Sequence, residues 1–231
     1  MIGSIRARAR RSAARCFVLL VLSQADLFPR IAHAEILAPG DVVLEDTIAV
    51  EVIGRDLVAF DLVGSGQLSE RLELEEEVLF TASRGRVAVV LTNRRLLGAT
   101  PTSSSWRAER YRLSETPQRS AWISQTLVLV VTGERALAFY GSGNWAEQSI
   151  GPREQVVTAR VGPATAVVVT DRRALGISGE HGGFFATELR LNEVIESVRA
   201  LSSIATLVTS QRTLVFKAPS GVWAERERTL R

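Results

Sequence analysis

The stretch Val87-Ala88-Val89-Val90-Leu91-Thr92-Asn93-Arg94-Arg95-Leu96 decides the fold of this 231-residue chain. A short β-branched run leads into a tight-turn sequence and then a second apolar run, which predicts two antiparallel strands joined by a hairpin. Asn93 suits the first loop position, because two-residue hairpin turns place residues at positive φ. The pattern returns in four other segments, of which the first is degenerate: Ile48–Leu57, Leu127–Ala136, Ala166–Ala174 and Ile204–Thr213.

Two further sequence features recur with the same period as the hairpin pattern. A large aromatic side chain recurs every 39 residues, at Trp106, Trp145, Phe184 and Trp223, while Gln67 holds this position in the first copy. A glutamate recurs at the same interval, at Glu76, Glu115, Glu154 and Glu193. Independent markers that share one period indicate an internal repeat.

Each repeat contains four short predicted strands and no helical periodicity, which is the size of one β-propeller blade. Over residues 36–231 the repeat resembles β-propeller blades in general, although it lacks the Gly-His and Trp-Asp pairs of WD40 repeats and the double glycine of kelch repeats. One aromatic per blade also superficially resembles lectins of the tachylectin kind, whose local motifs the chain does not share. We expect an all-β, five-bladed β-propeller of four-stranded antiparallel blades, at about residues 48–85, 86–125, 126–163, 164–203 and 204–231 plus 36–47.

The two ends of the repeat region complement each other. The last copy ends after its third strand, and Asp41–Leu44 forms a spare strand before the first copy. Pairing this N-terminal strand with Trp223–Thr229 completes the last blade and removes two unpaired sheet edges, which favour aggregation. We therefore expect a closed ring. A straight stack of repeats is the alternative, but it does not explain the split fifth unit.

Residues 1–34 have the pattern of a signal peptide. Arg6–Arg15 is basic, Cys16–Leu22 is apolar, and Ala32-His33-Ala34 is the small-x-small pattern that signal peptidase cleaves. The apolar run is shorter than the roughly 20 residues of a membrane span. We expect a cleaved leader, with an uncleaved anchor as the alternative. The mature chain, residues 35–231, is then periplasmic or secreted and has no membrane span.

Removal of the leader changes the charge of the protein. The full chain has 28 basic and 25 acidic residues, and the leader contains six of the arginines and one acid, Asp26. The mature chain is left with a net charge of about −2, so the basic isoelectric point of the full chain is no argument for a nucleic-acid partner. Cys16 is the only cysteine, so the mature protein depends on its apolar core rather than on disulfides.

Repeated charges are the first candidates for a site. An arginine opens the second strand of four repeats, at Arg95, Arg135, Arg173 and Arg212, and Asp56 replaces it in the first. In an up-and-down blade these arginines share a face with the four glutamates. The structural interpretation is a repeated Arg–Glu ion pair that fastens each blade or blade junction. The alternative is a basic ring that binds anions, which the repeated acids would neutralise.

The aromatics allow two interpretations as well. A bulky aromatic once per blade usually packs between neighbouring sheets. Alternatively, Trp106, Trp145, Phe184 and Trp223 form equivalent shallow ligand sites, each presenting a ring face to a sugar. Nearby polar residues such as Ser103, Ser142, Asn144 and Ser220 could then supply hydrogen bonds.

The inventory for catalysis is small. His181 is the only histidine of the mature chain and lies in a Gly-rich turn without a partner histidine or cysteine, so we expect no metal site. Glu51 is the one acid close to an innermost strand. No phosphate-binding loop, dinucleotide fingerprint or calcium loop is present, so we expect no cofactor. Paired carboxylates for glycoside hydrolysis stay open, because any two acids about 5–10 Å apart qualify.

These observations favour an exported, non-catalytic β-propeller that acts as a binding or scaffold module. Its partner, a protein or a cell-envelope glycan, would contact one propeller face. The alternative from another class is a small glycan-acting hydrolase that uses carboxylates on one face. Converging acids with a raised pKa would favour the enzyme, and fully paired carboxylates would favour the binding module.

Overall fold

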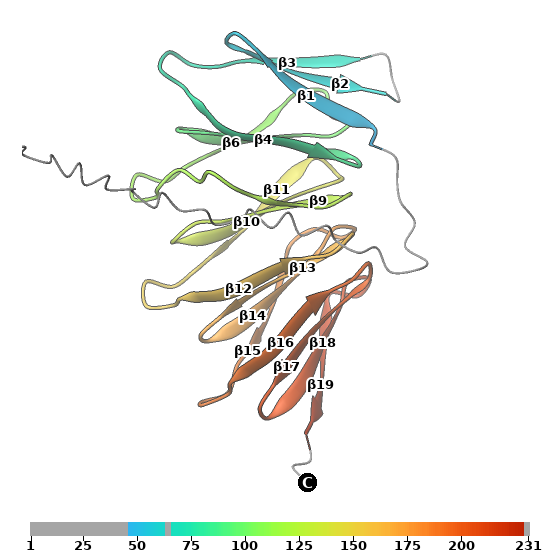
Figure 1. Ribbon diagram of the computed structural model, residues 1–231. Coiled ribbons are helices and arrows are strands. Elements are labelled where there is room, and N and C mark those ends of the chain that lie inside the picture. Colours follow the sequence, from blue (N-terminus) through green and yellow to red (C-terminus); the bar gives the residue numbers. More distant parts are fainter. Residues whose placement is uncertain (1–45, 63–65, 229–231) are drawn as a thin grey trace, which may run out of the picture. The chain divides into compact units, whose positions relative to one another are not determined.

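The computed structural model describes residues 46–62 and 66–228, and every regular element within them is a β-strand (Figure 1). The strands form five antiparallel sheets that follow one another along the chain. The first sheet contains β1 (Ile48–Ile53), β2 (Asp56–Asp61) and β3 (Gln67–Arg71). The second contains β4 (Val78–Arg84), β5 (Val87–Thr92), β6 (Arg95–Ala99) and β7 (Arg107–Arg110).

The remaining three sheets repeat the plan of the second. The third contains β8 (Trp122–Ile123), β9 (Leu127–Val131), β10 (Arg135–Tyr140) and β11 (Asn144–Ser149). The fourth contains β12 (Val156–Val161), β13 (Thr165–Thr170), β14 (Arg173–Ser178) and β15 (Phe184–Glu188). The fifth contains β16 (Ile195–Ala200), β17 (Ile204–Thr209), β18 (Arg212–Lys217) and β19 (Val222–Glu227). The predicted all-β class and the five repeated antiparallel units are therefore present.

The sheet boundaries differ from the predicted blade boundaries by one strand. The prediction placed residues 78–84 in the first blade, whereas β4 pairs with β5 and belongs to the second sheet. The reason is local. Gly85, at a φ of 56°, makes a tight hairpin between β4 and β5, while the longer turn after β3 crosses to the next sheet. Every later strand that follows a glutamate turn pairs forward in the same way.

This pairing removes one reason for the proposed ring closure. The fifth sheet already has four strands from one continuous segment, β16 to β19, and the sheet with three described strands is the first. The fifth unit is therefore not split in the manner that the prediction required. The spare strand Asp41–Leu44 lies outside the described residues.

Adjacent sheets pack face to face, and their apolar cores lie between them (Figure 1). β5 and β13 are buried along their whole length because they have a sheet on both sides. In the fifth sheet, β17 alternates between buried and half-buried residues because only one face is covered. Glycine allows two sheets to approach closely at some positions. A Cβ at Gly98 would lie 2.6 Å from the ring of Phe139 on the next sheet.

The first and fifth sheets each leave one face uncovered by described residues. Phe60 on the outer face of the first sheet is 40% exposed, while Phe139 and Phe216, at the same position of their sheets, are fully buried. Val222 on the outer face of the fifth sheet is 53% exposed. Among the described residues there is no helix of the length and apolarity that crossing a membrane requires.

Candidate binding edge

Each sheet is joined to the next by a tight turn that ends on one of the four predicted glutamates. In the turn between the second and third sheets, the Glu115 N–H donates to the Arg112 carbonyl at 3.0 Å, and the Glu115 carboxylate accepts the Arg112 N–H at 2.8 Å. The same two bonds recur with Glu76 and Glu73, Glu154 and Gly151, and Glu193 and Arg190. The glutamate thus closes its own turn twice and fixes the shape of the turn.

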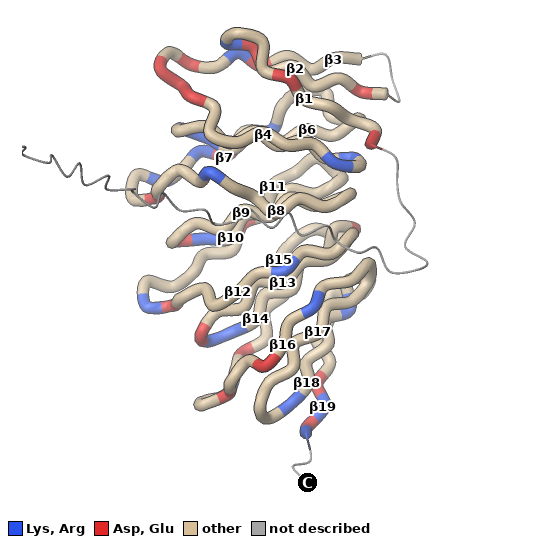
Figure 2. Tube along the Cα trace, in the orientation of Figure 1, with Lys and Arg blue, Asp and Glu red and all other residues tan. Residues whose placement is uncertain are grey.

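The four turns lie at the same end of the strands in successive sheets, and we use the word edge for this side of the molecule (Figure 1). The β-hairpins that carry the arginines lie at the same edge, because hairpin residues bind the turns directly. Asn93 accepts the N–H of Glu77 at 3.0 Å, and Asp171 accepts the N–H of Gln155 at 2.9 Å. Charged residues are frequent in these turns and hairpins (Figure 2).

The structure brings each predicted arginine onto its glutamate. Arg135 donates from Nε and Nη2 to the two carboxylate oxygens of Glu115, at 2.9 and 3.0 Å, and Thr132 donates its hydroxyl to the same carboxylate at 2.7 Å. The Glu115 side chain is fully buried, and that of Arg135 is 2% exposed. We call this group of glutamate, arginine and threonine a clasp. The other clasps are Glu76–Arg95–Thr92, Glu154–Arg173–Thr170 and Glu193–Arg212–Thr209.

The clasps join neighbouring sheets as well as neighbouring strands. Arg135, on β10 of the third sheet, donates from Nη2 to the carbonyl of Arg110 at the end of β7 in the second sheet, at 2.6 Å. Arg95, Arg173 and Arg212 make the equivalent bonds to the carbonyls of Arg71, Ser149 and Glu188. The arginines therefore satisfy backbone acceptors of the preceding sheet in addition to their glutamates.

The clasps hold their carboxylates in the ionised form. Burial by itself raises the pKa of Glu115, but hydrogen bonds from Arg135, the Arg112 N–H and Thr132 outweigh burial and lower this pKa below its ordinary value. The pKa values of Glu76 and Glu193 are lowered by the same balance, and that of Glu154 falls to about 2. A general acid needs a raised pKa, so these four carboxylates lack the property on which the hydrolase alternative depends.

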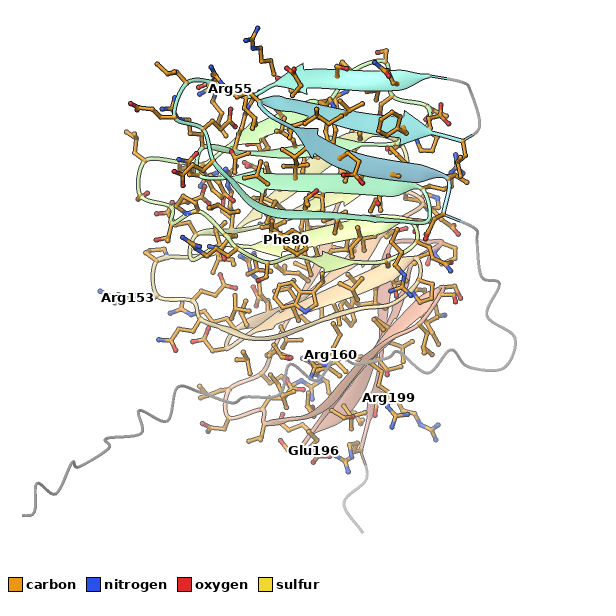
Figure 3. All side chains as sticks on the ribbon, turned by 45° about the horizontal axis from the view of Figure 1, so that its top comes forward. Arg55, Phe80, Arg153, Arg160, Glu196 and Arg199 are labelled. Atoms are coloured by element: carbon orange, nitrogen blue, oxygen red, sulfur yellow. The ribbon has the colours of Figure 1, made fainter. Side chains whose placement is uncertain are left out.

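The tips of the turns carry exposed apolar side chains. Leu74, Leu113 and Leu191 occupy the same position in three of the four turns and are 73%, 111% and 88% exposed, and Pro152 holds this position in the third turn. This turn position accepts most residue types, so the fold does not require leucine there. Beside Pro152, Arg153 points away from the sheets (Figure 3). We call the edge that carries Leu74, Leu113, Pro152 and Leu191 the turn edge.

The predicted aromatic ligand sites lie between sheets instead. Trp106 is buried, and Trp145, Phe184 and Trp223 are half-buried in the cores that separate their sheets from the preceding ones. The indole N–H of Trp145 donates to the Arg107 carbonyl at 2.9 Å, and that of Trp223 to the Phe185 carbonyl at 2.8 Å. Ring faces that pack on a neighbouring sheet are not open to a sugar, and the glycan interpretation of these residues has no support here.

The remaining candidates do not converge. His181 is exposed, and its backbone N–H donates to Ser178 Oγ at 3.2 Å. Glu51 is exposed on β1. Within residues 46–62 and 66–228, no group of three or more His, Cys, Asp or Glu side chains is placed to hold a metal ion.

Two sets of residues that matter in the structure had no role in the sequence interpretation. The threonines of the clasps stand three residues before each arginine, and this constant spacing is the signal that identifies them. The apolar turn tips stand two residues before each glutamate, so they also share the repeat interval. Their exposure, however, is visible only once the turn is built.

No family model and no curated protein sequence matches the chain. Among solved structures, the chain resembles Hsv2p of Kluyveromyces lactis (11% identity, TM-score 0.36, covering 82% of this chain and 63% of that one). It also resembles the N-terminal domain of Nup159 (13%, 0.35, 79% and 58%). Prp20p of Saccharomyces cerevisiae is a third such structure (9%, 0.39, 76% and 56%).

These structures are β-propeller proteins, and no specific family is identified for the chain. The chain spans about 60% of the length of each. Because the TM-scores lie below 0.5, the likeness does not decide whether the five sheets close into a ring or what the protein binds.

Proposed function

We propose that the protein is an exported, non-catalytic binding module that contacts a protein partner through the turn edge. The observation that carries this proposal is the row of exposed apolar tips, one on each of four turns that two hydrogen bonds close. Single exposed leucines are common on protein surfaces, but the same exposed position in successive repeats is not explained by chance exposure. Two hydrogen bonds fix the conformation of each turn, so the exposed side chains at the tips offer a preorganised apolar contact surface.

The charges around the tips favour a protein over a glycan as the partner. Glu75 stands beside Leu74, while Arg112 and Arg190 directly precede Leu113 and Leu191. Apolar anchors surrounded by a mixed charged rim are typical of protein–protein interfaces. A glycan site at the predicted aromatic positions would need open ring faces, which Trp106, Trp145 and Trp223 do not provide.

Export rests on the leader pattern of residues 1–34, which lie outside the described residues. Expression of the full chain in a bacterial host tests it: we expect a processed protein that begins at Glu35 in the periplasmic or secreted fraction. A protein that retains Met1 in the cytoplasm would contradict export. The closed five-bladed ring also stays a prediction.

The binding proposal is tested with a triple variant, Leu74→Asp, Leu113→Asp and Leu191→Asp. Immobilised wild-type protein is used to capture partners from the envelope of the native cell, and captured proteins are quantified by mass spectrometry. The matched control is Leu201→Asp, because Leu201 is 48% exposed and lies in the β16–β17 hairpin at the opposite edge of the sheets.

We expect the triple variant to lose a partner that both the wild type and the control retain. Thermal melting must show that the three proteins are equally stable, since exposed turn tips contribute little to folding. If every captured protein is retained by the triple variant, the turn edge is not the binding surface and the proposal is wrong.

A further inference from the structure

Three of the four clasps contain a second carboxylate, and this second carboxylate binds arginine Nη1. Arg95 Nη1 lies 2.7 Å from Glu70, on β3 of the preceding sheet, and Arg135 Nη1 lies 2.8 Å from Glu109, on β7. Arg135 also pairs with Glu147, and Arg212 with Glu225, each on the neighbouring strand of its own sheet. The side chains of these three arginines are 2–8% exposed.

The remaining clasp, the third along the chain, has no such second carboxylate among the described residues. Arg173 donates from Nε and Nη2 to Glu154, at 2.7 and 2.9 Å, and from Nη2 to the Ser149 carbonyl at 2.7 Å. The position that holds Glu70 and Glu109 in other sheets is Gln148 here, and the position that holds Glu147 and Glu225 is Ala186.

The consequence is a partly open arginine. Within the described part of the chain, Glu154 is the only carboxylate that pairs with Arg173, and the Arg173 side chain is 24% exposed. Glu188 stands opposite Arg173 across the β14–β15 ladder but forms no ion pair with it among the described residues. Nη1 therefore keeps the donors that its three counterparts use on a carboxylate.

Arg173 lines a hollow at the turn edge, formed by the β13–β14 hairpin, the end of β15 and the turn that follows β15. This hollow has a volume of about 640 Å³ and is lined by Arg172, Arg173, Arg190, Leu189, Leu191 and Glu188, among others. The three further acids of the lining have partners: Glu154 pairs with Arg173, Glu193 pairs with Arg212, and Asp171 accepts the N–H of Gln155. The hollow therefore combines the Arg173 guanidinium, whose Nη1 donors form no hydrogen bond with the described residues, with the apolar side chains of Leu189 and Leu191.

We propose that this hollow is a carboxylate-binding site, with Arg173 Nη1 as the principal donor. The other clasps show that an arginine in this setting accepts a further carboxylate at hydrogen-bond distance, and the hollow gives an external carboxylate access to the vacant position. The carboxylate belongs either to a small free ligand or to an acidic side chain of the partner. An acidic side chain of the partner as the source rests on the proposed function. In that case, the acidic residue of the partner lies next to the partner residue that contacts Leu191.

The first experiment uses glutarate as the probe. The Arg Nε–H signals of ¹⁵N-labelled protein are followed during titration with sodium glutarate, against sodium chloride at equal ionic strength. Arg173→Lys identifies the Arg173 signal. We expect a saturable shift of the Arg173 signal and none of the Arg135 signal, because the carboxylates of Arg135 are already in place. Absence of a saturable Arg173 shift overturns the proposal.

Ala186→Glu provides a variant that fills the site from within. It restores the carboxylate that Glu147 and Glu225 supply in the third and fifth sheets, so we expect glutarate to bind at least about tenfold more weakly, a loss of about 1.4 kcal/mol. Ala108→Glu is the matched control, because Ala108 occupies the same position of the second sheet, beside Arg95. Unchanged glutarate affinity in Ala186→Glu overturns the assignment to Arg173.

Capture of the partner then distinguishes the two sources. If Ala186→Glu loses both glutarate and the captured partner, the carboxylate is a side chain of that partner. If it loses glutarate alone, the ligand is a free carboxylate. The double variant Leu74→Asp and Leu113→Asp separates the two proposals, because neither leucine lines the hollow, so it should still bind glutarate even where it loses the partner.

Discussion

Glu115→Gln tests whether the clasps hold the sheets together. The Glu115 carboxylate is fully buried and accepts hydrogen bonds from Arg135 Nε, Arg135 Nη2, Thr132 Oγ1 and the Arg112 N–H. Glutamine keeps one acceptor oxygen but turns an NH₂ group toward donors, so at least one buried donor loses its partner. An unsatisfied buried donor costs about 1–3 kcal/mol, and breaking a buried ion pair costs about 3–5 kcal/mol.

Arg135 keeps Glu109 and Glu147 in this variant, so we expect the lower end of that range. A loss of about 3 kcal/mol corresponds to a fall in Tm of about 6–12 °C for a domain of this size. Urea denaturation followed by circular dichroism and tryptophan fluorescence measures the free energy of unfolding. Glu75→Gln is the control, because the Glu75 side chain lies in an equivalent turn but is 84% exposed. If the free energies of unfolding of both variants lie within about 0.5 kcal/mol of the wild type, the clasps do not stabilise the fold.

Three further predictions concern the clasps, the packing between sheets and the outer face of the first sheet. The clasp glutamates have lowered pKa values in the fold, that of Glu154 about 2, so their stabilisation is present above the ordinary carboxylate pKa and is lost as pH falls through the folded values. We therefore expect acid titration followed by circular dichroism to show a stability plateau at neutral pH and a decline that begins below about pH 5. An unfolding free energy that is constant down to about pH 2 would contradict this assignment.

Gly176→Ala places a Cβ 2.5 Å from the Phe216 ring and should lower the free energy of unfolding in urea by about 1–3 kcal/mol. The control Gly133→Ala meets no atom within 4 Å and should change it little. Equal stability of the two variants would contradict tight packing between these sheets. Glu51→Val gives the outer face of the first sheet the apolar residue that the inner sheets carry, so sedimentation velocity should detect self-association of the variant and not of the wild type.

The repeated features of the fold could be predicted from the sequence because they depend on local chemistry. The hairpin at Asn93 follows from two short apolar runs that flank a turn sequence, and β5 and β6 lie where the pattern predicts them. The positive φ predicted for Asn93 was wrong, since Glu75 and Asn192 are the non-glycine residues with positive φ in the described part of the chain. The pairing of Arg135 with Glu115 follows from their shared period and from the common edge of turns in an up-and-down sheet. Both inferences need only neighbouring elements.

Other features could not be predicted, because they depend on contacts between sheets. The sequence does not show whether β4 pairs with β3 or with β5, since both connections are antiparallel and short. The difference lies in the conformation of Gly85, which is one residue in a stretch without other signals. The burial of Trp145 could not be predicted either. Its ring packs on the preceding sheet, and its indole N–H donates to the carbonyl of Arg107 in that sheet, 38 residues earlier in the chain.

The outer faces of the first and fifth sheets set a physical condition on the predicted ring. Phenylalanine is accommodated between inner sheets by glycine, as Phe139 is by Gly98 and Phe216 by Gly176. At the junction that would close the ring, the corresponding residues are Phe60 and Val215, so the same spacing would overpack the core.

The same junction lacks other features of the inner ones. Glu51 stands where inner strands carry valine or leucine, and Asp56 replaces the clasp arginine. A face that carries a carboxylate without a partner among the described residues is costly to bury, whereas it suits a terminal repeat that ends in water. A ring would therefore need a fifth junction built differently from the four that the structure describes, with wider spacing and its own partner for Glu51.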